Sequence, residues 1–184
     1  MDKIVRQGIT QVLINHRDLL KIPLRHKAKF EGWLKFELAH YLEEIGMENV
    51  KVESKASFSR DRADITFFHN GEPHTIEMKT PNTNWKIKGV NSNCRPITKN
   101  IQSIIDDTKK LNSSNGICAF VLFPIPVGDN RWESYLYRIS EKTGIALSRE
   151  KNCNLIKVAV DSKNECNLMV CTFMSKRFSK FLCF

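Results

Sequence analysis

Several common signals are missing from the 184-residue sequence. No uninterrupted apolar run approaches the roughly 20 residues that span a bilayer. Residues 1–15 alternate charged with apolar side chains and do not form the apolar core of a signal peptide. We therefore expect an intracellular, cytoplasmic protein with no membrane partner. Six cysteines are present but no CxxC pair, so we expect reduced thiols and find little support for a structural zinc site.

The motifs of several enzyme classes are absent as well. There is no G-x-S-x-G turn, no glycine-rich phosphate loop and no arguable Cys/His pair. A serine hydrolase, a P-loop NTPase and a thiol protease therefore lack support. Internal repeats and linkers rich in proline or glycine are missing too, so we expect residues 1–184 to form a single domain.

The composition is that of a folded, basic protein. Apolar residues make up 41% of the chain and charged residues 27%, which is enough apolar content for a hydrophobic core. The 29 lysines and arginines exceed the 20 aspartates and glutamates and give a net charge of +9. A positive charge of this size favours a polyanionic partner such as nucleic acid.

Hydrophobic spacing predicts helices interleaved with strands. Helical spacing occurs over residues 3–20, 26–45, 97–111 and 132–143, with Pro23, Gly46 and Gly144 as end signals. Strand-like runs occur at residues 49–54, 63–69, 73–79, 117–123, 155–160 and 167–173, and residues 80–96 are expected to form a long polar loop. The unbroken apolar run that ends before Pro124 is typical of a strand buried on both faces. The expected fold class is α/β (α+β).

The hairpin around Asn70-Gly71 carries the chemistry. Pairing across this turn places Asp64 opposite Glu77 and turns Lys79 to the same face of the sheet. Facing carboxylates repel each other, whereas a divalent cation between them would remove the repulsion. Two carboxylates, a carbonyl oxygen and waters are a usual ligand set for Mg²⁺. We therefore expect Asp64 and Glu77 to bind Mg²⁺, with Mn²⁺ as a substitute, and Lys79 to assist phosphodiester hydrolysis.

These residues resemble a known family. Asp64 followed by Glu77-Met78-Lys79, on a hairpin preceded by a helix, resembles the PD-(D/E)XK nuclease superfamily, although Ala63 stands where the motif's name has proline. The resemblance covers roughly residues 26–125. It implies the restriction-endonuclease-like fold, with a central mixed β-sheet flanked by helices. It also implies that the two acids bind Mg²⁺, that the lysine assists hydrolysis, and that a glutamate on the preceding helix joins the metal site.

We assign that last role to Glu37. On a helical wheel Glu37 falls inside the apolar stripe, between Trp33 and Tyr41, where an unpaired acid is costly. The alternative is an edge position from which the carboxylate reaches water.

The [DE]xK triplet by itself is not specific, because it occurs at residues 53–55, 77–79, 107–109 and 161–163. Residues 107–109 are expected within a helix and residues 161–163 in a turn. Residues 53–55 lie on a plausible strand but lack an acidic residue on an upstream partner strand. Only Glu77 has both a strand position and such a partner. A solvated surface cluster is the alternative interpretation.

Polar residues near the hairpin are candidate nucleic-acid contacts. They are Arg60, Arg62, Asn82, Lys86, Lys88, Lys99 and Gln102. An ordinary polar loop explains Asn82, Lys86 and Lys88 as well, and a solvated polar surface explains the others. Our first hypothesis is a Mg²⁺-dependent nuclease. The resemblance to the PD-(D/E)XK superfamily favours DNA over RNA as its substrate. A non-catalytic nucleic-acid-binding module on the same fold and a basic protein-interaction domain are the alternatives. Whether the chain works as a homodimer stays open.

Overall fold

The computed structural model describes residues 1–55, 62–90, 97–111 and 115–175. Six strands form one sheet in the order β1-β2-β3-β4-β6-β5, in which β3 and β4 run parallel and the other neighbours antiparallel. The strands are β1 (Glu48–Lys55), β2 (Arg62–His69), β3 (Glu72–Lys79), β4 (Gly116–Ile125), β5 (Cys153–Ala159) and β6 (Glu165–Met174). The sheet is therefore mixed, as expected.

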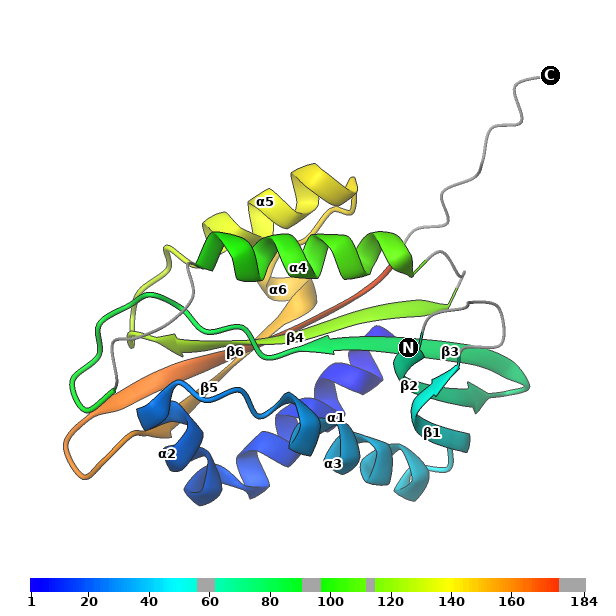
Figure 1. Ribbon diagram of the computed structural model, residues 1–184, viewed down its shortest axis with the longest axis horizontal. Coiled ribbons are helices and arrows are strands. Elements are labelled where there is room, and N and C mark those ends of the chain that lie inside the picture. Colours follow the sequence, from blue (N-terminus) through cyan, green and yellow to red (C-terminus); the bar gives the residue numbers. More distant parts are fainter. Residues whose placement is uncertain (56–61, 91–96, 112–114, 176–184) are drawn as a thin grey trace.

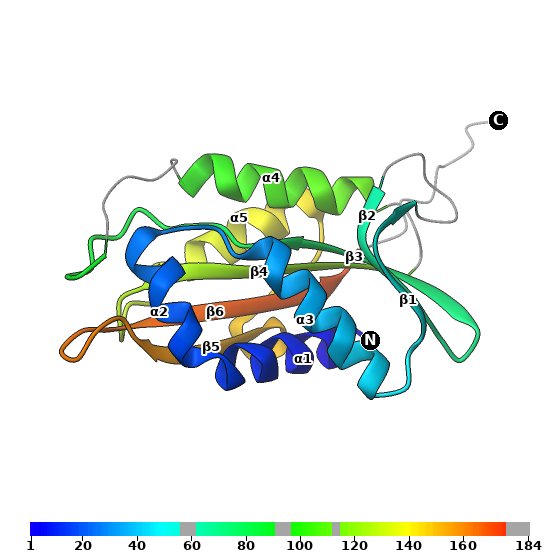
Figure 2. The same ribbon diagram turned by 60° about the horizontal axis from the view of Figure 1, so that its bottom comes forward.

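Helices lie on both faces of this sheet, as Figures 1 and 2 show. The helices are α1 (Asp2–Asn15), α2 (Arg17–His26), α3 (Glu31–Glu44), α4 (Ile97–Lys110), α5 (Glu133–Thr143) and α6 (Arg149–Asn152). The first three cover one face, whereas α4 and α5 cover the other. The prediction of an α+β protein with a mixed sheet flanked by helices is confirmed.

The core consists of two apolar clusters, one on each side of the sheet. Alternate residues of β4 enter them: Ile117 and Ala119 pack with α1 to α3, whereas Cys118 and Phe120 pack with α4 and α5. Every residue of β4 is buried, which confirms the prediction of a strand covered on both faces. The strand continues through Pro124 to Ile125, so the proline does not end it as expected.

The β2–β3 hairpin has the predicted register. Its paired residues run from Ile65 and Ile76 to His69 and Glu72. Asn70 and Gly71 both have positive φ, as the two-residue turn of a tight hairpin requires. The apolar face of the hairpin is buried in the cluster beneath α1 to α3. The opposite face is therefore the one that carries the polar side chains.

The first predicted helix is wrong in its extent. The chain turns at His16, and residues 17–26 form a separate helix that contains Pro23. Both helices bury apolar residues, for example Leu13 of α1 and Leu24 of α2. A proline removes one backbone hydrogen bond from a helix, but burial of the apolar face offsets that loss.

The second predicted helix begins five residues late, at Glu31, because Lys27 adopts a left-handed conformation (φ 48°) that closes α2. Gly46 and Gly144 follow the ends of α3 and α5 with positive φ, as predicted. The short helix α6 was not predicted. No helix within the described residues is long and apolar enough to cross a membrane.

The start of the expected polar loop is buried. Thr80 to Thr83 are buried, and the segment runs along the end of β4, where the Phe123 N–H donates to the Pro81 carbonyl (3.1 Å) and the Thr83 N–H to the Phe123 carbonyl (2.7 Å). The loop is therefore exposed only from residue 84 within its described part, and residues 91–96 lie outside the described residues.

Candidate functional site

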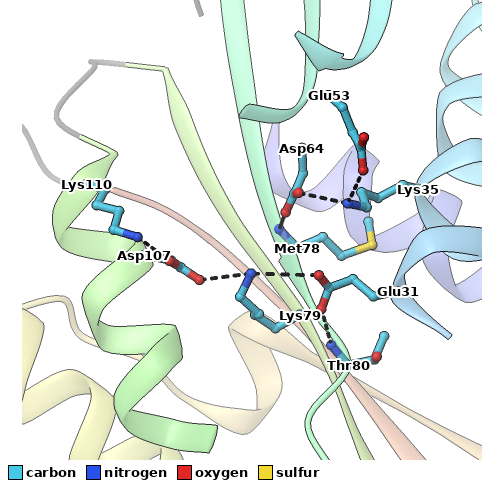
Figure 3. Close-up of polar contacts among 9 residues, drawn as sticks. All are labelled: Glu31, Lys35, Glu53, Asp64, Met78, Lys79, Thr80, Asp107 and Lys110. Atoms are coloured by element: carbon cyan, nitrogen blue, oxygen red, sulfur yellow. Dashed lines mark hydrogen bonds and ion pairs between the residues drawn. The ribbon is translucent and has the colours of Figure 1, made fainter. Parts of the chain in front are cut away.

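The candidate site lies at the carboxyl end of β3, between the two helical layers. Asp64 comes from β2, and Glu77 and Lys79 come from β3. Helix α3 approaches from one face of the sheet and α4 from the other, and each contributes charged side chains (Figure 3). The expectation that the hairpin brings Asp64, Glu77 and Lys79 to one region holds, because Glu77 interacts electrostatically with both of the others.

Asp64 has both carboxylate oxygens engaged. Its Oδ2 accepts a hydrogen bond from the backbone N–H of Met78 at 2.7 Å, and its Oδ1 lies 3.0 Å from Lys35 Nζ. The described backbone pairing of β2 with β3 begins at the next residue, Ile65. A side chain therefore takes a β3 N–H where the regular ladder stops, and this contact fixes the direction of the carboxylate.

Lys35 is the cation that accompanies Asp64. It projects from α3, its side chain is only 9% exposed, and its Nζ also lies 3.1 Å from Glu53 Oε1. Burial by itself lowers the pKa of Lys35, but the hydrogen bonds to Asp64 and Glu53 outweigh burial and raise it above the usual lysine value. Lys35 therefore stays charged at neutral pH.

Glu77 is in the opposite situation. It forms no hydrogen bond or ion pair with any residue that the structure describes. Burial, followed by the negative charges of Asp64 and Asp107, raises the pKa of Glu77 to about 7. This carboxyl group therefore holds a proton more readily than an ordinary glutamate, and a nearby cation would shift it towards the charged form.

Lys79 links the two helical layers. Its Nζ lies 3.1 Å from Asp107 Oδ2 on α4 and 3.8 Å from Glu31 Oε1 at the start of α3 (Figure 3). Asp107 also pairs with Lys110 (3.3 Å), and Glu31 Oε2 accepts a hydrogen bond from the backbone N–H of Thr80 (3.3 Å). Burial lowers the pKa of Lys79, but the negative charges of Glu31 and Asp107 raise it by more. The pKa of Lys79 is therefore above the usual lysine value.

The cluster as a whole carries more acid than base. Its carboxylates are Glu31, Glu53, Asp64, Glu77 and Asp107, and its ammonium groups are Lys35, Lys79 and Lys110. Five acids against three bases leave an excess of two negative charges when all are ionised. Within the described ranges no three or more Asp, Glu, His or Cys side chains are grouped so that they could hold a metal together. A metal here would rely on Asp64 and Glu77 with backbone oxygen and water.

No family model, curated protein or solved structure matches this chain.

The structure corrects the expected role of Glu37. Glu37 accepts a hydrogen bond from Trp33 Nε1 (3.1 Å) and pairs with His16 Nε2 (3.4 Å). It follows Lys35 by two residues, which is about 200° around a helix, so it leaves α3 on nearly the opposite side. The carboxylate that α3 directs at Lys79 is Glu31, one turn before Lys35. Trp33 and His16 explain how an acid is accommodated inside the apolar stripe.

Sequence reasoning missed Glu31, Lys35 and Asp107. Glu31 and Lys35 are four residues apart on α3 and therefore share a face, but nothing in the sequence shows which face meets the hairpin. Asp107 belongs to a [DE]xK triplet that we interpreted as an ordinary helical position. Its burial in a helix that faces β3 is a tertiary property, so the triplet alone could not have shown it.

The candidate nucleic-acid contacts divide into two groups. Asn82 is buried, donates from Nδ2 to the Lys27 carbonyl (2.7 Å) and accepts from Asn100 at its own carbonyl (3.0 Å). This corrects its expected role, since a buried amide bonded to backbone cannot reach a phosphate. The exposed candidates are Arg62, Lys86, Lys88, Lys99 and Gln102, the last of which also donates to Asp106 (2.9 Å). Arg60 lies outside the described residues.

Proposed function

We propose that this protein is a Mg²⁺-dependent nuclease that hydrolyses phosphodiester bonds, with DNA as the preferred substrate. The observation that carries the proposal is the state of Glu77. This carboxyl group forms no ion pair or hydrogen bond with the described residues, and the effects of burial and of Asp64 and Asp107 on its pKa outweigh those of Lys79 and Lys110. A folded protein gains no stability from such an arrangement, so its presence favours a role that includes a bound cation.

The donor atoms fit a hard divalent ion. Asp64 and Glu77 offer carboxylate oxygens, which Mg²⁺ prefers together with water, and the excess negative charge of the cluster matches a doubly charged ion. These two residues would hold the metal. When bound, Mg²⁺ would polarise a phosphate oxygen and lower the pKa of a coordinated water.

Lys79 supplies the second part of the chemistry. Its ammonium is held between Glu31 and Asp107, yet a quarter (25%) of its side chain is exposed, and in this proposal a phosphate oxygen approaches it from that side. Its raised pKa keeps it protonated at neutral pH. We therefore assign it the neutralisation of negative charge that develops on the phosphate in the transition state.

The architecture of the sheet and helices supports the proposal of a nuclease. A mixed sheet with helices on both faces is the arrangement that the resemblance to the PD-(D/E)XK nuclease superfamily implies. The restriction-endonuclease-like fold is part of the proposal. The exposed Lys86, Lys88 and Lys99 would contribute phosphate contacts that give affinity without sequence preference.

The test is cleavage of plasmid DNA, single-stranded DNA and RNA in Mg²⁺, in Mn²⁺ and in EDTA. We expect metal-dependent cleavage by the wild type and none by Glu77→Gln. Glu165→Gln, which removes an exposed glutamate paired with Lys157, is the matched control and should cleave normally. Binding without cleavage would favour the non-catalytic nucleic-acid-binding module, and neither binding nor cleavage would favour a protein-interaction domain.

A further inference from the structure

Lys35 is the most buried cation of the cluster, and its two partners differ. Asp64 is itself largely buried, with 15% of its side chain exposed, whereas Glu53 is 59% exposed. A buried ammonium needs a compensating charge, and either carboxylate could supply it. Only Asp64, however, is also a proposed metal ligand. The same oxygen, Asp64 Oδ1, is thus the partner of Lys35 and a candidate donor to the metal.

Each carboxylate oxygen of Asp64 already has a partner while Lys35 is in place. Its Oδ2 is directed at the Met78 N–H and its Oδ1 at Lys35 (Figure 3). A divalent ion on this carboxylate would therefore meet the ammonium charge at close range. Lys35 can give up Asp64 without losing all compensation, because Glu53 lies 3.1 Å from the same Nζ.

We propose that Lys35 is an internal counter-cation that competes with the divalent metal for Asp64 and thereby sets the metal affinity of the site. The inference rests on the proposed function, because it needs a metal at Asp64 and Glu77. In the absence of metal, Lys35 neutralises Asp64 and keeps its carboxylate aligned with β3. In its presence, Lys35 retains Glu53 as partner. Lys35 is a positioning residue and not a catalytic one.

The experiment measures Mn²⁺ binding by titration calorimetry, together with the Tm of each protein with and without Mn²⁺. We expect Lys35→Met to bind Mn²⁺ about tenfold more tightly than the wild type, since close charge pairs couple at least this strongly. Its Tm without metal should fall and its gain in Tm on adding Mn²⁺ should exceed that of the wild type. Lys35→Arg keeps the charge and should bind like the wild type.

Lys21→Met is the matched control, because Lys21 also pairs with an aspartate (Asp18, 2.6 Å) but on α2; its Mn²⁺ affinity should not change. Glu53→Gln removes the alternative partner and should weaken Mn²⁺ binding. In the Lys35→Met background the same change should have a smaller effect, because Glu53 acts partly through Lys35.

The outcomes separate the two proposals. If no variant binds Mn²⁺, the metal-dependent function fails, and this inference fails with it. If the wild type binds Mn²⁺ and Lys35→Met binds it equally or more weakly, the counter-cation role is overturned while the proposed function stands. Should Lys35→Met not fold, Glu53→Gln decides alone, since an unchanged affinity would overturn the role of Lys35.

Discussion

Two triplets of the same type, Glu77-Met78-Lys79 and Asp161-Ser162-Lys163, lie in opposite environments. Asp161 accepts hydrogen bonds from the backbone N–H groups of Lys163 (2.8 Å) and Asn164 (2.9 Å). The first of these bonds and the amide of Asn164 lower the pKa of Asp161. Glu77 lacks such donors among the described residues, and burial next to other acids raises its pKa to about 7.

The difference shows what turns a charge pattern into a site. A turn exposes N–H donors that satisfy an aspartate locally, so the acid of residues 161–163 stabilises the loop and needs nothing else. A strand uses its N–H groups in the sheet, so an acid there depends on side chains from other elements. At residues 77–79 those elements bring further carboxylates, and the local charge stays unbalanced.

The other two triplets sharpen this lesson. The acids of residues 53–55 and 107–109 both enter the cluster, Glu53 through Lys35 and Asp107 through Lys79. From the sequence we treated the four triplets as alternative positions for a single site. In the fold, the acids of three of them lie in one charged cluster.

The largest expected effect comes from replacing the lysine of each of the two triplets by alanine. Lys79→Ala should lower the rate of DNA cleavage by about 10²–10³-fold, because it removes a charge directed at the transition state. Lys163→Ala, in the exposed turn, should cleave at the wild-type rate. Most of the DNA affinity should survive in both variants, as binding comes from many phosphate contacts. A Lys79→Ala protein that cleaves normally would remove this lysine from the mechanism.

The next effect concerns stability without metal. The pKa of Glu77 is about 7 in the folded state, whereas an ordinary glutamate has a pKa of 4.5. Between these two pH values the folded state holds a proton that the unfolded state has lost. The wild type therefore loses stability as pH rises through this window and does not recover it above pH 7. At about pH 8, Glu77→Gln should raise the free energy of unfolding by about 1–3 kcal/mol. At about pH 4 the substitution should hardly change it, because Glu77 is then protonated in both states.

Urea denaturation in EDTA at both pH values measures this difference. Asp161→Asn is the contrasting control, because the lowered pKa of Asp161 adds stability above its unfolded pKa and loses it as pH falls. Its substitution should therefore bring no gain at alkaline pH. An unchanged stability of Glu77→Gln at alkaline pH would mean that Glu77 is already compensated.

The smallest effect concerns the orientation of Lys79. Asp107→Asn should lower the cleavage rate about tenfold, as expected for loss of a charged contact. It should also move the alkaline limb of the pH–rate profile to lower pH, since Asp107 raises the pKa of Lys79. Asp106→Asn, next in sequence but exposed and bonded to Gln102, should leave both unchanged. An unshifted profile in Asp107→Asn would show that Glu31 alone positions the lysine.

Local patterns gave the hairpin and its register, because the side-chain alternation of a strand and the positive φ of Asn70-Gly71 depend on neighbouring residues only. The same patterns failed at the first helix, where apolar spacing continued across His16 although the chain turns there. They failed also for Glu37 and Asn82, since a polar residue type does not reveal which buried partner satisfies it.

By itself the sequence determined the fold class, the buried central strand and the hairpin that brings Asp64, Glu77 and Lys79 together, because periodicity records which side of each element is apolar. The tertiary structure alone decided which charges surround that face. Glu31 and Lys35 arrive from α3 and Asp107 from α4, and the packing of these helices on opposite sides of the sheet is a property of no single segment. The balance of charges depends on distances in space and on burial. Both are set by the packing of the helices against the sheet.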